Sequence, residues 1–212
     1  GSWAALGEDG ITANRADYAS AIVGELSRSA EELLVQWAED GGDFSGQLSE
    51  EQGFGPYGDE QAALTAVFHS LFYVEKTTKD LKLGLPIGLG DCAGSTCPDQ
   101  LEGILSERSL DSIVDNVQGF QEAFTGGEGV GFDDYLVEVG HGDLSESILA
   151  DIAAFLELAE AFEGNLYEAI VADSDQLDPL YAALGSVTRA LKVDMVTVLS
   201  LTVPAEASGD ND

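Results

Sequence analysis

Apolar residues recur at steps of three and four positions along nearly the whole chain, which is the spacing of one face of an α-helix. This pattern predicts long helices over 12–40, 59–83, 106–125, 144–172 and 177–201, and a short helix over "FDDYLVEV". Several of these segments end at glycine pairs or proline, and none alternates between apolar and polar residues as a half-buried strand does. We therefore expect an all-α fold, an antiparallel helical bundle of five long helices and one short helix.

The length and composition set the expected domain organisation. A chain of 212 residues can form one domain, or two small ones that share a core. We expect one helical bundle domain over 1–205, followed by an acidic, polar tail over 206–212. No apolar run approaches the roughly 20 residues of a membrane helix, so we expect no membrane span in this chain.

The charge of the chain is strongly one-sided. Forty acidic residues and eight basic ones give a formal net charge of −32, while a hydrophobic content of 44% is too high for a disordered acidic tail. Such a chain repels itself unless salt screens the charge, which is typical of proteins from halophiles. Nucleic acids and anionic membranes need a basic surface and are not expected as partners.

The scarce positive charge is concentrated in one place. Three of the four lysines, Lys76, Lys79 and Lys82, lie near the end of the helix expected over 59–83. Cations at that end interact favourably with the helix dipole, and their stems can cover apolar surface. The alternative is a contact with an anion or with a partner.

Two cysteines lie in a loop, "GDCAGSTCPD". Cys92 and Cys97 are close enough in sequence for a disulfide, which we prefer over two free thiols, and two such ligands alone cannot complete a zinc site. A disulfide would place the protein outside the cytosol.

One segment has the composition of a metal site. In "DYLVEVGHGD", Asp134, Glu138 and His141 follow each other at the spacing of one helical face. Two carboxylates and an imidazole could bind iron or another divalent metal such as zinc. The alternative is that the helix ends before His141, because Gly140 and Gly142 flank it, and that acid pairs at this spacing recur by chance.

No residues are assigned to catalysis. His69 lies among aromatic residues and is interpreted as a histidine with satisfied hydrogen bonds at the edge of the core. Asp111 and Asp115 have the spacing of paired carboxylates, but a solvated helix face explains them as well. Neither a nucleophile with its base nor a zinc-protease motif is found, so an enzyme is the less favoured class.

Short motifs in a fixed order resemble the imelysin family. They are "RADYASAIVGELSRSAEELLVQW", "LKLGLPIG", "LSERSLDSIVDNVQGFQEAFTG" and "LGSVTRALKVDMVTVLSLTVPAEASGDND". They are similar to the later part of the family domain, and the third is the most specific. Imelysin-like proteins are helical, secreted or lipid-anchored proteins, grouped as imelysin-like peptidases and as iron-regulated proteins.

The resemblance implies an extracytoplasmic protein of iron uptake that binds iron, haem or a surface protein partner without catalysis. The alternatives are an imelysin-like metallopeptidase and a helical protein-interaction module. The family marker Gly-x-His-x-x-Glu is missing from "GSWAALGEDG". We expect that the marker lies before this chain, or that it has degenerated with Trp3 in place of its histidine. No metal ligand or catalytic residue is therefore transferred from the family.

Overall fold

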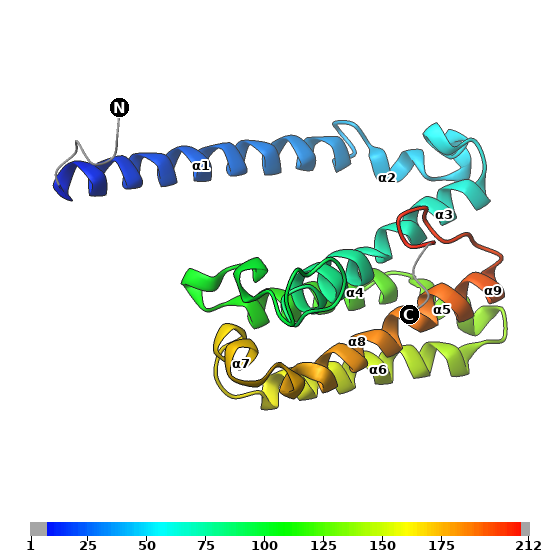
Figure 1. The fold of residues 1–212 in the computed structure, drawn as a ribbon. Helices are drawn as coiled ribbons and strands as arrows, with labels where there is room; N and C mark the ends of the chain where they lie inside the picture. The colour runs from blue at the N-terminus through cyan, green and yellow to red at the C-terminus, as the bar shows by residue number, and fades with distance from the viewer. Residues whose placement is uncertain (1–7, 209–212) are drawn as a thin grey trace. The chain divides into compact units, whose positions relative to one another are not determined.

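The computed structural model describes residues 8–208, which form helices and loops without any strand. The all-α prediction is confirmed (Figure 1). The α-helices are α1 (Glu8–Trp37), α2 (Phe44–Gln47), α3 (Glu60–Leu71), α4 (Ser109–Thr125), α5 (Phe132–Glu138), α6 (Gly142–Ala161), α7 (Leu166–Asp173), α8 (Asp178–Arg189) and α9 (Val196–Leu199). Two π-helices are η4 (Val74–Gly84) and η8 (Ala190–Met195). Short 3-10 helices are η2 (Glu50–Gln52), η3 (Gly55–Tyr57), η5 (Pro98–Gln100), η6 (Ile104–Ser106) and η7 (Ser174–Leu177).

The chain divides into two compact units, residues 1–63 and 64–212, whose boundary lies within α3. In the first unit, α1 runs for 30 residues. Its last residue, Trp37, packs edge-to-face on Phe44 of α2, with ring centroids 5.1 Å apart. The helix expected over 12–40 is therefore present.

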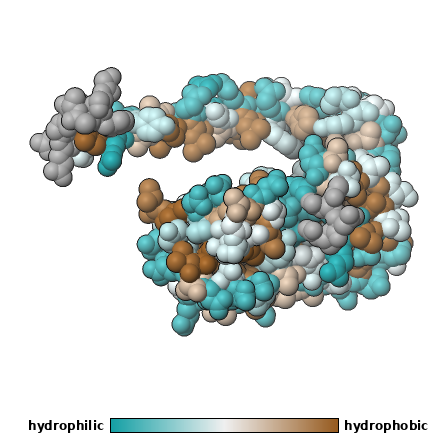
Figure 2. Space-filling model, viewed as in Figure 1, coloured by the Kyte–Doolittle hydropathy of each residue, from teal (hydrophilic) through white to brown (hydrophobic). Residues whose placement is uncertain are grey.

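The apolar face of α1 is exposed rather than buried. Tyr18, Leu26 and Leu34 are 69%, 67% and 69% exposed. Figure 2 shows hydrophobic residues gathered along this helix. The sequence pattern correctly predicts an amphipathic helix, but its own unit does not cover the apolar face.

The second unit contains the hydrophobic core. Helix α6 packs against α5 and α8, and α4 packs against η4 and α6. Ile148, Ile152 and Phe155 of α6 are fully buried, as their spacing predicts. Burying each such side chain stabilises the fold by about 1.5–3 kcal/mol. Phe68 of α3 extends the core through edge-to-face contacts with Phe72 and Phe132.

The structure differs from the expected elements at three places. The segment 144–172 is not one helix, because Gly164 adopts a φ of +97° and Asn165 starts α7 by accepting the backbone N–H of Glu168 at 2.9 Å. The segments over 59–83 and 177–201 each change from α-helix to π-helix, into η4 and η8.

The described helices include none that is both long enough and apolar enough to cross a membrane. The bundle domain expected over 1–205 stays a prediction, as does the acidic tail over 206–212. Residues 209–212 of that tail lie outside the described residues.

Candidate ligand-binding site

The lysine-rich segment forms the π-helix η4. In a π-helix the backbone N–H bonds to the carbonyl five residues earlier, and the Leu85 N–H donates to the Asp80 carbonyl at 2.7 Å in this way. Such segments are rare and are frequently found at functional sites. Here the π-helix carries Lys76, Lys79 and Lys82, and each has an acidic neighbour.

A buried ion pair joins the two π-helices. Glu75 of η4 is fully buried, and Lys192 of η8 places its Nζ 2.7 Å from Glu75 Oε1. Neither carboxylate oxygen of Glu75 accepts a hydrogen bond of normal geometry within the described residues. We treat the contact as an ion pair, because opposite charges this close attract each other strongly in a buried environment. Lys192 therefore places a positive charge beside the buried carboxylate.

Asp80 is held between two lysines. Its Oδ2 lies 2.9 Å from Lys76 Nζ, and its Oδ1 lies 3.3 Å from Lys79 Nζ. Lys79 is 1% exposed, and its ammonium group lies 5.2 Å from the centroid of the Tyr181 ring, which is a cation–π distance. A Cβ at Gly84 would lie 3.0 Å from the Tyr181 ring, so a glycine there leaves room for the ring.

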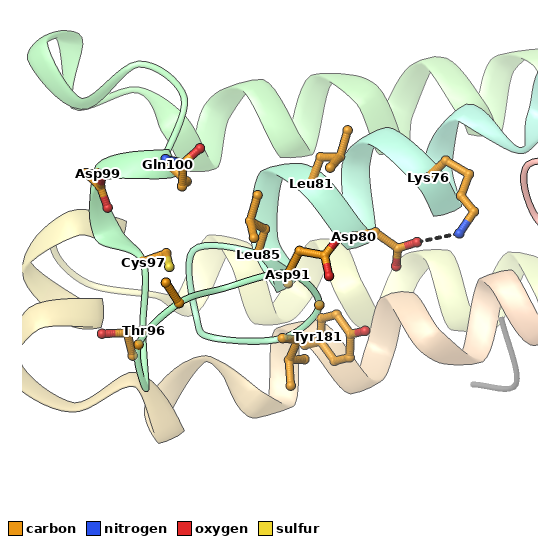
Figure 3. A pocket seen from close by; sticks show the side chains of 15 residues that line it. Lys76, Asp80, Leu81, Leu85, Asp91, Thr96, Cys97, Asp99, Gln100 and Tyr181 are labelled. Carbon is orange, nitrogen blue, oxygen red and sulfur yellow. Dashed lines mark hydrogen bonds and ion pairs between the residues drawn. The ribbon is translucent and has the colours of Figure 1, made fainter.

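Lys76, Asp80 and Tyr181 line a pocket of about 1230 Å³ within the second unit. Figure 3 shows it between the end of η4, the loop that contains Cys97, and Tyr181 of α8. Its walls combine apolar side chains with carboxylates, one lysine and an amide. The residues that line it are Lys76, Asp80, Leu81, Gly84, Leu85, Leu89, Gly90, Asp91, Ala93, Gly94, Thr96, Cys97, Asp99, Gln100 and Tyr181.

The loop side of the pocket contains the expected disulfide. Cys92 and Cys97 are bonded, with their Cα atoms 5.9 Å apart. The Cys97 N–H donates to the carbonyl of Pro86 at 2.9 Å, and the Leu89 N–H donates to that of Gly84 at 2.9 Å. The disulfide interpretation is therefore confirmed, and Cys97 lies in the wall of the pocket.

Comparison with known proteins identifies the family. The model of the imelysin family matches residues 3–192, which is most of the chain. The chain belongs to the imelysin family. No curated protein and no solved structure matches the chain. Trp3, which would replace the histidine if the family marker has degenerated, lies outside the described residues.

The metal site expected in this imelysin-family chain is not assembled on one helix. Helix α5 ends at Glu138, the chain turns at Gly140 with a φ of +87°, and His141 precedes α6. Asp134 Oδ2 accepts the backbone N–H of Gly131 at 3.2 Å, which caps α5. Within the described part of the chain, no group of three His, Cys, Asp or Glu side chains could hold a metal ion. A site formed by Asp134, Glu138 and His141 stays a prediction.

The remaining candidates have structural partners. His69 Nε2 lies 2.8 Å from the Thr202 carbonyl oxygen, in agreement with a histidine satisfied at the edge of the core. Asp111 pairs with Arg108 at 2.8 Å on an exposed face. Asp115 lines a small pocket of about 250 Å³ together with Val74 of η4.

The buried pair of Glu75 and Lys192 and the contact of Lys79 with Tyr181 were not predicted from the sequence. The partners lie far apart in the chain, so no local spacing brings them together. The signal for buried charge in the sequence was only indirect. Glu75 and Lys79 lie one helical turn apart in a charged segment that apolar stretches flank on both sides.

Proposed function

We propose that this chain is an extracytoplasmic imelysin-family protein of iron uptake that binds its ligand without catalysis. Its ligand is iron carried in a molecule, such as haem, and its site is the pocket beside η4. The pocket, about 1230 Å³ in volume, is the observation that carries this proposal. Sites for small molecules usually have about 300–1,000 Å³ and mix apolar walls with a few polar groups.

The lining of the pocket supports a ligand that carries a metal cation, because the carboxylates of Asp80, Asp91 and Asp99 outnumber the ammonium group of Lys76. In a chain with a formal net charge of −32, the pocket borders the segment that holds three of the four lysines. Lys76, which pairs with Asp80, is the one lysine that lines the pocket. The apolar side chains of Leu81, Leu85 and Leu89 supply contact area for a flat macrocycle.

Two features support an extracytoplasmic location. The Cys92–Cys97 disulfide persists in oxidising compartments and is rare in the cytosol. The family likewise groups secreted and lipid-anchored proteins.

The test is a titration with hemin in molar salt, followed by its absorbance, on the wild type and two tryptophan variants. Ala93→Trp adds a large side chain in the pocket wall, whereas Val130→Trp places the same side chain at an exposed position outside it. We expect saturable binding that Ala93→Trp weakens at least about tenfold, or about 1.4 kcal/mol, and that Val130→Trp changes less than twofold. Absence of saturable binding, or equal effects of both variants, would refute the proposal. Chelator-sensitive cleavage of a protein substrate would indicate the metallopeptidase instead.

A metal ion bound directly by Asp134, Glu138 and His141 is tested separately. Fe(II) and Fe(III) are titrated at molar salt by calorimetry, with excess calcium as competitor. Iron binding that excess calcium does not displace, and that is lost in His141→Ala, would support this metal site. Uptake that calcium displaces would indicate nonspecific binding to the acidic surface.

A second candidate function is a helical interaction module, which the exposed apolar face of α1 favours. Replacing Leu26 and Leu34 by glutamine removes apolar surface from this face, while Ser27→Gln changes an exposed polar position of the same helix. If the face mediates association, the double variant lowers the mass seen by light scattering at molar salt and Ser27→Gln does not. A wild type that stays monomeric at every concentration would speak against association between copies.

A further inference from the structure

The loop that forms one wall of the pocket is held in place by few contacts. Ile87 and Leu101, which flank it, are 8% and 5% exposed and anchor its ends in the core. Between them, the side chains at 89–91 and 93–95 are exposed. A segment with so little buried apolar surface opens locally at low cost unless something else restrains it.

The two arms of this loop meet at two places. Gly88 has a φ of +103°, and a Cβ there would overlap the carbonyl oxygen of Ser95, so the arms touch at this point. The Cys92–Cys97 disulfide joins the same two arms covalently. One backbone hydrogen bond, from the Cys97 N–H to the Pro86 carbonyl, adds to this restraint. The disulfide is therefore the strongest restraint on the shape of the loop.

The position of the loop sets the size of the pocket. Most residues that line the pocket belong to 89–100, and they include Asp91, Thr96 and Asp99. The opposite wall, formed by η4 and Tyr181, is fixed by the Lys76–Asp80 ion pair and by the packing of Lys79 on the Tyr181 ring. A change in the loop therefore moves one wall of the pocket and leaves the other in place.

We propose that the Cys92–Cys97 disulfide is a redox-controlled latch that keeps this wall closed and that an extracytoplasmic dithiol opens it. Both cysteines are partly exposed and can be reached from solvent. A thiolate of the dithiol attacks one cysteine sulfur, and the S–S bond breaks while a mixed disulfide forms. The second thiol of the dithiol then displaces the cysteine. Two electrons and two protons thereby pass to the protein, which gains two thiols, and the dithiol becomes a disulfide.

The expected effect follows from loop closure. Releasing a covalent ring of about six residues returns chain entropy that corresponds to roughly a 40-fold easier local opening. The opening of the loop does not depend on what the pocket binds. The effect on ligand binding, in contrast, rests on the pocket function proposed above.

The test measures amide hydrogen exchange by mass spectrometry on the full chain at molar salt, oxidised and after treatment with dithiothreitol. The double variant Cys92→Ser/Cys97→Ser is the matched control, because dithiothreitol has no bond to reduce in it. We expect exchange in peptides that cover 86–100 to rise at least tenfold on reduction and to be equally fast in the variant, while peptides of 144–160 stay unchanged. Hemin binding is measured on the same three samples.

The outcomes separate the two proposals. Faster exchange in 86–100 together with weaker hemin binding supports the latch and the pocket function. Faster exchange without hemin binding in any sample supports the loop latch and overturns the pocket function. Exchange that changes less than twofold on reduction overturns the latch, and faster exchange with unchanged hemin affinity overturns its control of the pocket.

Discussion

Removing the lysine of the buried ion pair should destabilise the second unit strongly. In Lys192→Met the side chain keeps its length and apolar stem, but Glu75 Oε1 loses the ammonium group at 2.7 Å. The Glu75 and Lys192 side chains are only 1% and 12% exposed, so water cannot replace the lost partner without opening the bundle. The buried carboxylate would then lose the positive charge that lies beside it.

The magnitude follows from this burial. Breaking a buried ion pair by removing one partner costs about 3–5 kcal/mol. For a unit of this size, each kcal/mol lowers the midpoint of thermal unfolding by roughly 2–4 °C, so a decrease on the order of 10 °C is expected. An exposed pair contributes at most about 1 kcal/mol. Arg108 and Asp111, whose side chains are 72% and 56% exposed, provide that comparison.

The assay is urea unfolding followed by circular dichroism at 222 nm, at low and at molar salt. Lys192→Met and Arg108→Met each remove one positive charge, so the change in net charge is the same. The cost of Arg108→Met should vanish at molar salt, where exposed charges are screened, and that of Lys192→Met should persist. The double variant Glu75→Leu/Lys192→Met should regain most of the lost stability, because an apolar pair can replace a buried ion pair.

Two results would refute this reasoning. If Lys192→Met costs no more than Arg108→Met, the pair of Glu75 and Lys192 is not buried as the structure shows. If the double variant is as unstable as Lys192→Met alone, the loss comes from the packing of the lysine stem and not from the charge of Glu75.

Four further substitutions in the second unit test local features of its helices. Burial raises the pKa of Asp151 above its ordinary value, against the opposing effect of the Arg189 charge. The folded state then binds the Asp151 proton more tightly than the unfolded state, so the free energy of unfolding falls as pH rises from the ordinary pKa through the raised one. Asp151→Asn should therefore raise the unfolding midpoint at pH 7 and leave it unchanged at pH 3. Gly126 ends α4 with a φ of +68°, and a Cβ there would lie 2.5 Å from a backbone carbonyl oxygen. Gly126→Ala should therefore lower the free energy of unfolding in urea by more than about 1 kcal/mol. In contrast, Gly119→Ala within α4, where no atom lies within 4 Å of a Cβ, should stabilise by about 0.5–1 kcal/mol. Asn165→Ala removes the cap of α7 and should cost about 1 kcal/mol in the same assay.

Each of these predictions has a contradicting result. Glu157→Gln removes an exposed carboxylate from the same helix as Asp151, and an equal gain in both variants would show that reduced net charge, not burial, is the cause. Equal effects at Gly126 and Gly119 would contradict the role of backbone conformation at the end of α4. An unchanged free energy of unfolding in Asn165→Ala would mean that tertiary packing, and not the cap, starts α7.

The helices were predictable where the apolar pattern coincides with the core. Ile148, Ile152 and Phe155 fall on one face and are all buried, so periodicity placed α6 correctly. The break between α6 and α7 was missed, although Asn165 followed by Glu168 is a recognisable start signal for a helix. On α1 the same periodicity predicted an amphipathic helix but could not reveal what covers its apolar face.

The candidate site was predictable only where its parts are neighbours in sequence. The disulfide of Cys92 and Cys97 followed from their short separation. The pocket did not, because it combines residues of 76–100 with Tyr181. The π-helical geometry of η4 likewise has no signature in a 3.6-residue pattern, which describes only the α-helical repeat.

The placement of the lysines has a practical consequence for chemical modification. The four lysine side chains are between 1% and 27% exposed, and each lies next to a carboxylate. Amine-acylating reagents and amine cross-linkers should therefore find hardly any reactive side-chain amine on the folded protein. Biotinylation through lysine would label mainly molecules whose bundle has opened, so the rate of lysine acylation becomes a direct measure of how often the second unit unfolds.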